Sequence, residues 1–137
     1  MTGPTLRQKQ LGLEHPDTLM TMANLADVYR SQGRYDEAES LCSRALKGDE
    51  KALGSEHPDT LKAVHNLAII YQLQGRYSDA EGLHKRALSG REKVLGLGHP
   101  ATLDTMEKLA DFFNKQGRQE DEIFLRNRFA PVTKSAA

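Results

Sequence analysis

The chain has 137 residues, of which 38% are hydrophobic and 28% are charged, and its 19 lysines and arginines balance its 19 aspartates and glutamates. A chain of this length can bury a core without disulfides or metal ions, and its balanced charge gives no positive field for nucleic acid or an anionic membrane. Its longest apolar run, 67–71, is far shorter than the roughly 20 residues of a membrane-spanning helix. The single cysteine, Cys42, excludes an internal disulfide and is typical of a reducing compartment, so we expect a cytoplasmic protein.

The sequence repeats itself every 42 residues. A His-Pro pair recurs at 15–16, 57–58 and 99–100, and roughly 25 of 42 positions are identical between the first two full copies, whereas the third copy is degenerate. Such a period indicates an array of similar structural units. We expect a remnant of a preceding repeat's second helix in 1–12, three repeats in 13–54, 55–96 and 97–130, the last a capping repeat, and a flexible tail in 131–137.

The first half of each copy predicts an amphipathic helix, because its apolar residues fall at i, i+3, i+7 and i+10. Proline suits the first turn, where its missing N–H would have no partner, and Gly33, Gly75 and Gly117 are typical left-handed stops. The expected buried faces are Leu19, Met22, Ala26 and Tyr29, then Leu61, Val64, Ala68 and Tyr71, then Leu103, Met106, Ala110 and Phe113.

A second helix is expected to begin near Asp36 or Ser78, and residues 78–81 have the spacing of a capping box. Small alanines on its apolar face allow the close approach that an antiparallel helix pair requires. These faces are Ala38, Leu41, Ala45 and Leu46 in the first copy and Ala80, Leu83, Ala87 and Leu88 in the second. In the third copy we expect the helix to end at 129–131.

One helix pair cannot bury both of its faces, whereas stacked pairs can. The sequence therefore predicts an all-α fold, a right-handed superhelical solenoid of antiparallel helix pairs. Gly48 and Gly90 lie inside the long second helices, where each costs about 1 kcal/mol relative to alanine. Either they bend or loosen those helices, or they allow a neighbouring helix to approach closely.

The segment Asn24–Glu39, NLADVYRSQGRYDEAE, resembles a tetratricopeptide repeat. The 42-residue spacing and the junction from Leu53-Gly54 to His57-Pro58-Asp59-Thr60-Leu61 are similar to those of the kinesin light chain subtype, and similar arrays end many fungal and bacterial signalling NTPases. The matching core positions are Leu25, Ala26, Tyr29, Gly33, Ala38 and Ala45, and again Leu67, Ala68, Tyr71, Gly75, Ala80 and Ala87.

The resemblance implies that the first helix of each repeat lines a concave groove that receives a peptide. The implied groove residues are Met20, Ala23, Asn24, Asp27 and Arg30 in the first copy, Lys62, His65, Asn66, Ile69 and Gln72 in the second, and Asp104, Glu107, Lys108, Asp111 and Asn114 in the third.

Asn24 and Asn66 stand where kinesin light chains carry an asparagine implicated in holding the bound backbone, and an amide offers both a donor and an acceptor. The alternative is that these amides tie neighbouring helices together. Acidic residues in the third copy suggest a ligand with apolar anchors and a basic end over that copy, unless they merely solvate an exposed helix.

Catalytic and metal chemistry have no candidate residues in this sequence. His15, His57 and His99 are predicted caps or packing residues at helix starts, and His65 and His84 lack ligand partners at metal spacing. Cys42 is expected to be a buried small hydrophobic residue rather than a reactive thiol. We therefore expect no enzyme, no cofactor and no metal ion.

The sequence favours a non-catalytic scaffold that binds a protein or peptide in its groove and has neither nucleic acid nor a membrane as its partner. The alternative is a structural or self-associating segment of a larger signalling protein. Because only the remnant in 1–12 covers the first repeat, this end is a possible surface for a homo-oligomer.

Overall fold

The computed structural model describes residues 16–135, which form six α-helices and no strand. The expected all-α fold is therefore confirmed, whereas the predicted remnant in 1–12 and His15 lie outside the described residues. No helix in 16–135 is long and apolar enough to cross a bilayer. The helices are α2 (Pro16–Ser31), α3 (Tyr35–Leu53), α4 (Pro58–Leu73), α5 (Tyr77–Leu95), α6 (Pro100–Lys115) and α7 (Gln119–Ser135).

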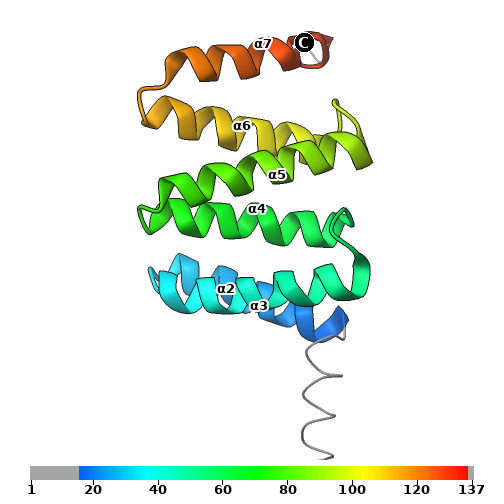
Figure 1. The fold of residues 1–137 in the computed structure, drawn as a ribbon, viewed down its shortest axis with the longest axis vertical. Helices are drawn as coiled ribbons and strands as arrows, with labels where there is room; N and C mark the ends of the chain where they lie inside the picture. Colours follow the sequence, from blue (N-terminus) through cyan, green and yellow to red (C-terminus); the bar gives the residue numbers. More distant parts are fainter. Residues whose placement is uncertain (1–15, 136–137) are drawn as a thin grey trace, which may run out of the picture.

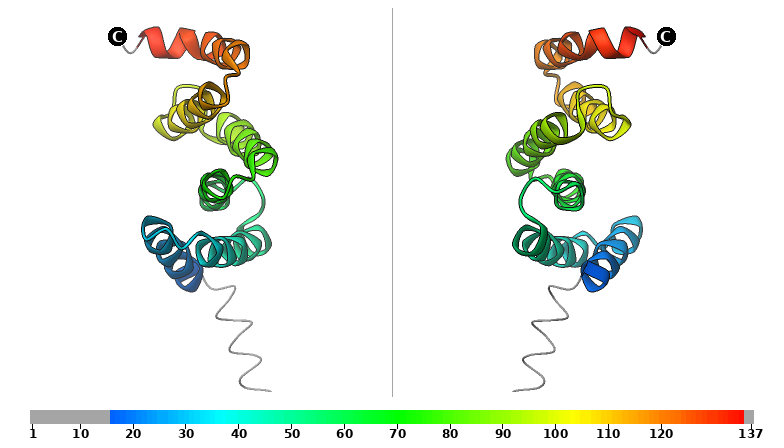
Figure 2. Two further views of the ribbon diagram at one scale, coloured as in Figure 1. Left: turned by 90° about the vertical axis from the view of Figure 1, so that its left-hand side faces the viewer. Right: turned by 90° about the vertical axis from the view of Figure 1, so that its right-hand side faces the viewer.

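Successive helices are antiparallel neighbours: α2 and α3 lie side by side at one end, and α4 to α7 follow one another along the long axis (Figure 1 and Figure 2). Seen from the side, α2, α4 and α6 lie on one side of the stack and α3 and α5 on the other, while the helix axes turn progressively from end to end (Figure 2). This turning is the superhelical twist of a solenoid. It places the first helices of the three repeats side by side along one surface.

Local sequence signals set the helix ends as predicted. Nδ1 of His57 accepts a hydrogen bond from the backbone N–H of Asp59 at 3.1 Å, and His99 caps α6 in the same way through Ala101 at 3.0 Å. Gly33, the stop after α2, has a φ of 79°, in the left-handed region where a β-carbon would be strained. The histidine cap thus recurs at the start of α4 and α6, and a glycine with positive φ follows each of the three first helices.

The predicted capping box at 78–81 is wrong. The N-cap of α5 is Arg76, and its side chain makes no capping hydrogen bond. Instead its guanidinium lies 4.0 Å from the centroid of the Tyr71 ring and forms ion pairs with Asp79 and with Glu39 of the preceding repeat. The arginine that follows the Gln-Gly pair thus fixes the turn by stacking and ion pairing.

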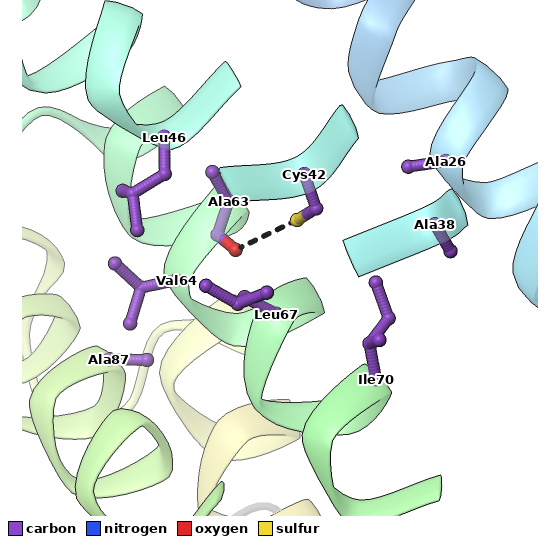
Figure 3. Close-up of a cluster of buried hydrophobic side chains, with 9 residues drawn as sticks. All are labelled: Ala26, Ala38, Cys42, Leu46, Ala63, Val64, Leu67, Ile70 and Ala87. Carbon is purple, nitrogen blue, oxygen red and sulfur yellow. Dashed lines mark hydrogen bonds between the residues drawn. The ribbon is translucent and has the colours of Figure 1, made fainter. Parts of the chain in front are cut away.

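The apolar faces predicted for the paired helices form the core. The cluster between α3 and α4 includes Cys42, Leu46, Val64 and Leu67 (Figure 3). Burial raises the pKa of the Cys42 thiol to about 12, and Sγ lies 3.5 Å from the carbonyl oxygen of Ala63. Cys42 is therefore a buried packing residue, as expected.

The last helix differs from its prediction, because α7 continues through Pro131 to Ser135 rather than ending at 129–131. Phe129 is fully buried, and Val132 packs against the same apolar cluster. The hydroxyl of Thr133 donates to the carbonyl of Phe129 at 3.2 Å. This apolar contact and hydrogen bond give Val132 and Thr133, which we assigned to a flexible tail, a packed helical position.

Both α3 and α5 run without interruption through Gly48 and Gly90. A β-carbon on Gly90 would lie 2.5 Å from Cδ2 of Leu61 in α4. The second of the two interpretations, close approach of a neighbouring helix, is therefore confirmed at Gly90.

Candidate functional site

A hollow lies where α4 and α6 face each other, and we call it the α4–α6 cavity. Its volume is about 570 Å³, within the usual range for ligand sites. It is lined by Arg30 of α2, Lys62, His65, Asn66, Ile69, Gln72 and Leu73 of α4, Arg91 of α5, and Asp104, Lys108, Asp111 and Lys115 of α6.

A smaller cavity of about 80 Å³ lies between α2 and α4, and we call it the α2–α4 cavity. It is lined by Leu19, Met20, Ala23 and Asn24 of α2, Asp49 and Leu53 of α3, and Asp59, Lys62, Ala63 and Asn66 of α4. Because Lys62 and Asn66 line both cavities, the two form neighbouring parts of one groove along the first helices.

All but three of the predicted groove residues line one of these two cavities. The exceptions are Asp27, Glu107 and Asn114. Asp27 is 3.7 Å from Arg30 within α2. Glu107 forms an ion pair with Arg126 of α7 at 2.9 Å, and the amide of Asn114 donates a hydrogen bond to Glu122 of α7 at 3.0 Å. Most of the predicted residues therefore line cavities along the first helices, whereas Glu107 and Asn114 of α6 contact α7.

The amides of Asn24 and Asn66 border the groove with no hydrogen-bond partner among residues 16–135. Asn24 is exposed and Asn66 is half-buried, and neither side chain makes a hydrogen bond to another residue in 16–135. The alternative that these asparagines tie neighbouring helices together is thus not supported. Each amide keeps a free donor and a free acceptor toward the groove.

Two buried imidazoles lie under the α4–α6 cavity. His65 and His84 meet edge to face with their ring centroids 6.3 Å apart, and Nε2 of His84 is 3.1 Å from Oε1 of Gln72. Burial lowers the pKa of each to about 4; for His65 the charge of Arg91 lowers it further, and Asp104, 3.6 Å away, opposes this. Both rings are therefore neutral near pH 7.

Sequence analysis did not single out Asp49 and Arg91. They belong to α3 and α5, the second helices of their repeats, and line the α2–α4 and α4–α6 cavities respectively. Each is only 8% exposed. They occupy the same repeat position, 42 residues apart, with opposite charges. The first two copies are closely similar, so a position at which the charge is reversed stands out. This reversal could have identified Asp49 and Arg91 from the sequence.

The acidic residues of the third repeat are largely compensated within the chain. Glu107 is paired with Arg126, and Asp111 lies 3.1 Å from Lys115. Lys62 and Lys108 form no ion pair with any described residue, although both line the α4–α6 cavity. The geometry thus does not support a basic ligand end over the third repeat.

Within 16–135, no group of three or more histidine, cysteine or acidic side chains could hold a metal ion. The groove offers hydrogen-bonding amides, buried charges and the apolar side chains of Ile69 and Leu73. Such a surface can recognise a ligand by its shape and polarity.

A family model of the tetratricopeptide repeat matches the sequence three times, over 5–41, 17–93 and 63–125. The chain belongs to the tetratricopeptide repeat family. No match was found among curated proteins. Repeats of this family generally mediate protein–protein interactions, and the array is of the kinesin light chain-like type.

Solved structures of tetratricopeptide arrays share this fold. A kinesin light chain from Podosopora anserina with nearly identical TPR-like repeats is 28% identical with a TM-score of 0.81, and the match covers 90% of this chain and 59% of that one. A point variant of that kinesin light chain is 27% identical with a TM-score of 0.83 and coverages of 96% and 62%. BtubC (BKLC) from P. vanneervenii, at 19% identity, a TM-score of 0.83 and coverages of 94% and 52%, supports the fold alone. The chain thus spans between about half and two thirds of the length of these relatives.

Proposed function

We propose that this tetratricopeptide array is a non-catalytic scaffold that binds an extended peptide segment of a partner protein in the groove along α2, α4 and α6. The observation that carries the proposal is the pair of asparagines, Asn24 and Asn66, whose amides border the groove with no partner among the described residues. An extended peptide presents one donor and one acceptor per residue, which such amides can satisfy.

The α4–α6 cavity supports the same function through its size and its apolar surface. Ile69 is half-buried and Leu73 is 47% exposed, so both present apolar surface to a ligand side chain. Burial of one apolar side chain contributes about 1.5–3 kcal/mol, whereas the hydrogen bonds chiefly fix register and direction. We therefore expect binding to combine an apolar anchor with main-chain recognition.

The test is a selection from a displayed library of random peptides, followed by affinity measurements on the resynthesised peptides. We expect the double variant Asn24→Ala/Asn66→Ala to bind groove peptides roughly tenfold more weakly, because it loses two neutral hydrogen bonds. Asn127→Ala, which changes an exposed asparagine on α7, is the matched control and should bind normally. Circular dichroism checks that all variants fold.

Peptides that bind the double variant as tightly as the wild type would contradict the proposed role of the asparagines. If the library yields no peptide and the chain instead dimerises in sedimentation experiments, the self-associating role is the better explanation. Because the single cysteine is a buried thiol, we further propose that the array works in a reducing compartment such as the cytoplasm.

A further inference from the structure

Two buried charges of opposite sign lie beneath the groove, one repeat apart. Asp49 of α3 lines the α2–α4 cavity, and Arg91 of α5 lines the α4–α6 cavity. Both side chains are more than nine-tenths buried, at 8% exposure each. The groove therefore has an acidic part over the first repeat and a basic part over the second and third.

Among the described residues, Asp49 has no partner that would explain its burial. No described residue donates a hydrogen bond to its carboxylate or forms an ion pair with it, and Asp59 adds a second acid to the same cavity. Burial raises the pKa of Asp49, the charge of Asp59 raises it further, and the nearby His57 partly opposes this rise. A desolvated carboxylate without a cation is costly, and a cationic ligand group would remove that cost.

Arg91 has donors left over for an anion. Its Nη1 donates to Oγ1 of Thr105 at 2.6 Å and to the carbonyl of Ala101 at 3.2 Å, both uncharged acceptors. No carboxylate of the described chain forms an ion pair with it, and a guanidinium offers five N–H donors in a planar fork. A carboxylate reaching the α4–α6 cavity could therefore pair with Arg91 in a charge-assisted contact.

Of the other charges, Lys108 agrees with this polarity, whereas Asp104, whose charge also acts on Arg91, opposes it. Lys62 and Lys108 line the α4–α6 cavity without an ion pair, and Lys62, although it also lines the α2–α4 cavity, pairs with neither Asp49 nor Asp59. Of the acids in the α4–α6 cavity, Asp111 is paired with Lys115. Asp104 faces the neutral imidazole of His65.

We infer that the groove selects a peptide with two opposite charges in a fixed order: a lysine or arginine at Asp49, over α2 and α4, and an aspartate, a glutamate or the terminal carboxylate at Arg91, between α4 and α6. This inference rests on the proposed function and adds to it the charge pattern and direction of the ligand. Charge complementarity sets direction because the reversed peptide would place like charges together at both sites.

The inference is tested by double-mutant cycles on a peptide selected as described above. The peptide is synthesised with its basic residue replaced by glutamine, with its acidic residue replaced by glutamine, and in reversed order. Each version is titrated against the wild type, Asp49→Asn, Arg91→Gln and, as a matched control outside both cavities, Asp36→Asn. Because Arg91 also links α5 to α6, Lys108→Gln is the second variant on the basic side if Arg91→Gln does not fold.

For the wild type we expect each glutamine replacement in the peptide to weaken binding about tenfold or more, as a charge-assisted hydrogen bond is lost. In the Asp49→Asn variant, replacing the basic residue of the peptide should weaken binding almost no further. This result would demonstrate direct coupling between Asp49 and that basic residue. Arg91→Gln or Lys108→Gln should show the same coupling with the acidic residue. Asp36→Asn should behave as the wild type.

Groove peptides that show no preferred charge order, or no coupling to Asp49, would overturn this inference and leave the proposed function intact, provided that they still lose affinity for the asparagine double variant. If no peptide binds in the groove at all, the proposed function fails and this inference fails with it. The two failures are therefore distinguishable.

Discussion

Gly90 in α5 lies against Leu61 in α4 so closely that a β-carbon on residue 90 would lie 2.5 Å from Leu61 Cδ2 and 2.9 Å from Cδ1. Leu61 is only 1% exposed, so its side chain has little room to move aside. The glycine therefore sets the spacing between these two helices. It does so at the expense of helix propensity.

We expect Gly90→Ala to destabilise the protein by about 1 kcal/mol, because a steric cost of roughly 1–3 kcal/mol outweighs the gain in helix propensity. Gly82→Ala in the same helix is the matched control, since its β-carbon would meet no atom within 4 Å. That variant should be more stable by about 0.5–1 kcal/mol. Urea denaturation measures both, and equal stabilisation by the two alanines would contradict the close contact.

Asp49→Asn should increase stability near neutral pH, by about 1 kcal/mol, because it removes a buried carboxylate without a cationic partner. Burial raises the folded-state pKa of Asp49, so its ionisation costs stability as pH rises through that pKa. The gain from asparagine should therefore vanish in acid, below the ordinary carboxyl range. A variant equally stabilised at pH 3 and pH 7 would show that charge is not the cause.

Acid should destabilise the array through its two buried imidazoles. Burial lowers the pKa of His65 and His84 to about 4 in the folded chain, whereas unfolded histidine titrates near 6.5. Stability should thus fall between about pH 6.5 and pH 4, by on the order of 1–2 kcal/mol per histidine at pH 5. His84→Leu should reduce the slope of stability against pH in this window.

The ring protons of His65 and His84 provide a direct check by NMR titration. A ring that titrates near pH 6.5 in the folded protein would contradict its burial. The slope, rather than the absolute stability of the variant, is the relevant readout, because the leucine changes packing as well as charge.

Phe129→Ala should destabilise the chain by about 3–5 kcal/mol, because the side chain is fully buried between α7 and the helices beneath it. Phe124→Ala on the same helix is the control, since that ring is 74% exposed. Its effect should stay within about 0.5 kcal/mol. Thermal unfolding followed by circular dichroism measures both, and a small effect at Phe129 would mean that α7 does not pack as described.

Much of the fold could be predicted from local sequence signals. The apolar positions Leu61, Val64 and Ala68 recur with helical period, and glycine with positive φ ends each first helix. The N-cap of α5 at Arg76 could not be found in this way, because stacking on Tyr71 and pairing with Glu39 of the preceding repeat position it. The capping box at 78–81 had the right spacing but competed with these contacts.

The candidate groove was also only partly predictable. Helical periodicity and the family pattern indicated Asn24 and Asn66, because surface positions on a first helix follow from its buried face. Asp49 and Arg91 belong to the second helices, and only the stacking of successive repeats shows that they reach the groove. The contact of Glu107 with α7 could not be predicted either, since its partner Arg126 lies 19 residues further along the chain.

By itself, the sequence determined the 42-residue period, because its copies can be aligned directly. It also determined the helix type, the buried faces and the first-helix surface, because each of these depends on residues within about ten positions of one another. The tertiary structure alone decided which buried charges lie beneath the groove, which surface acids are already paired, and that α7 extends past Pro131. These properties depend on contacts between repeats or between paired helices. Such contacts follow from the distance and twist between helices rather than from any local pattern.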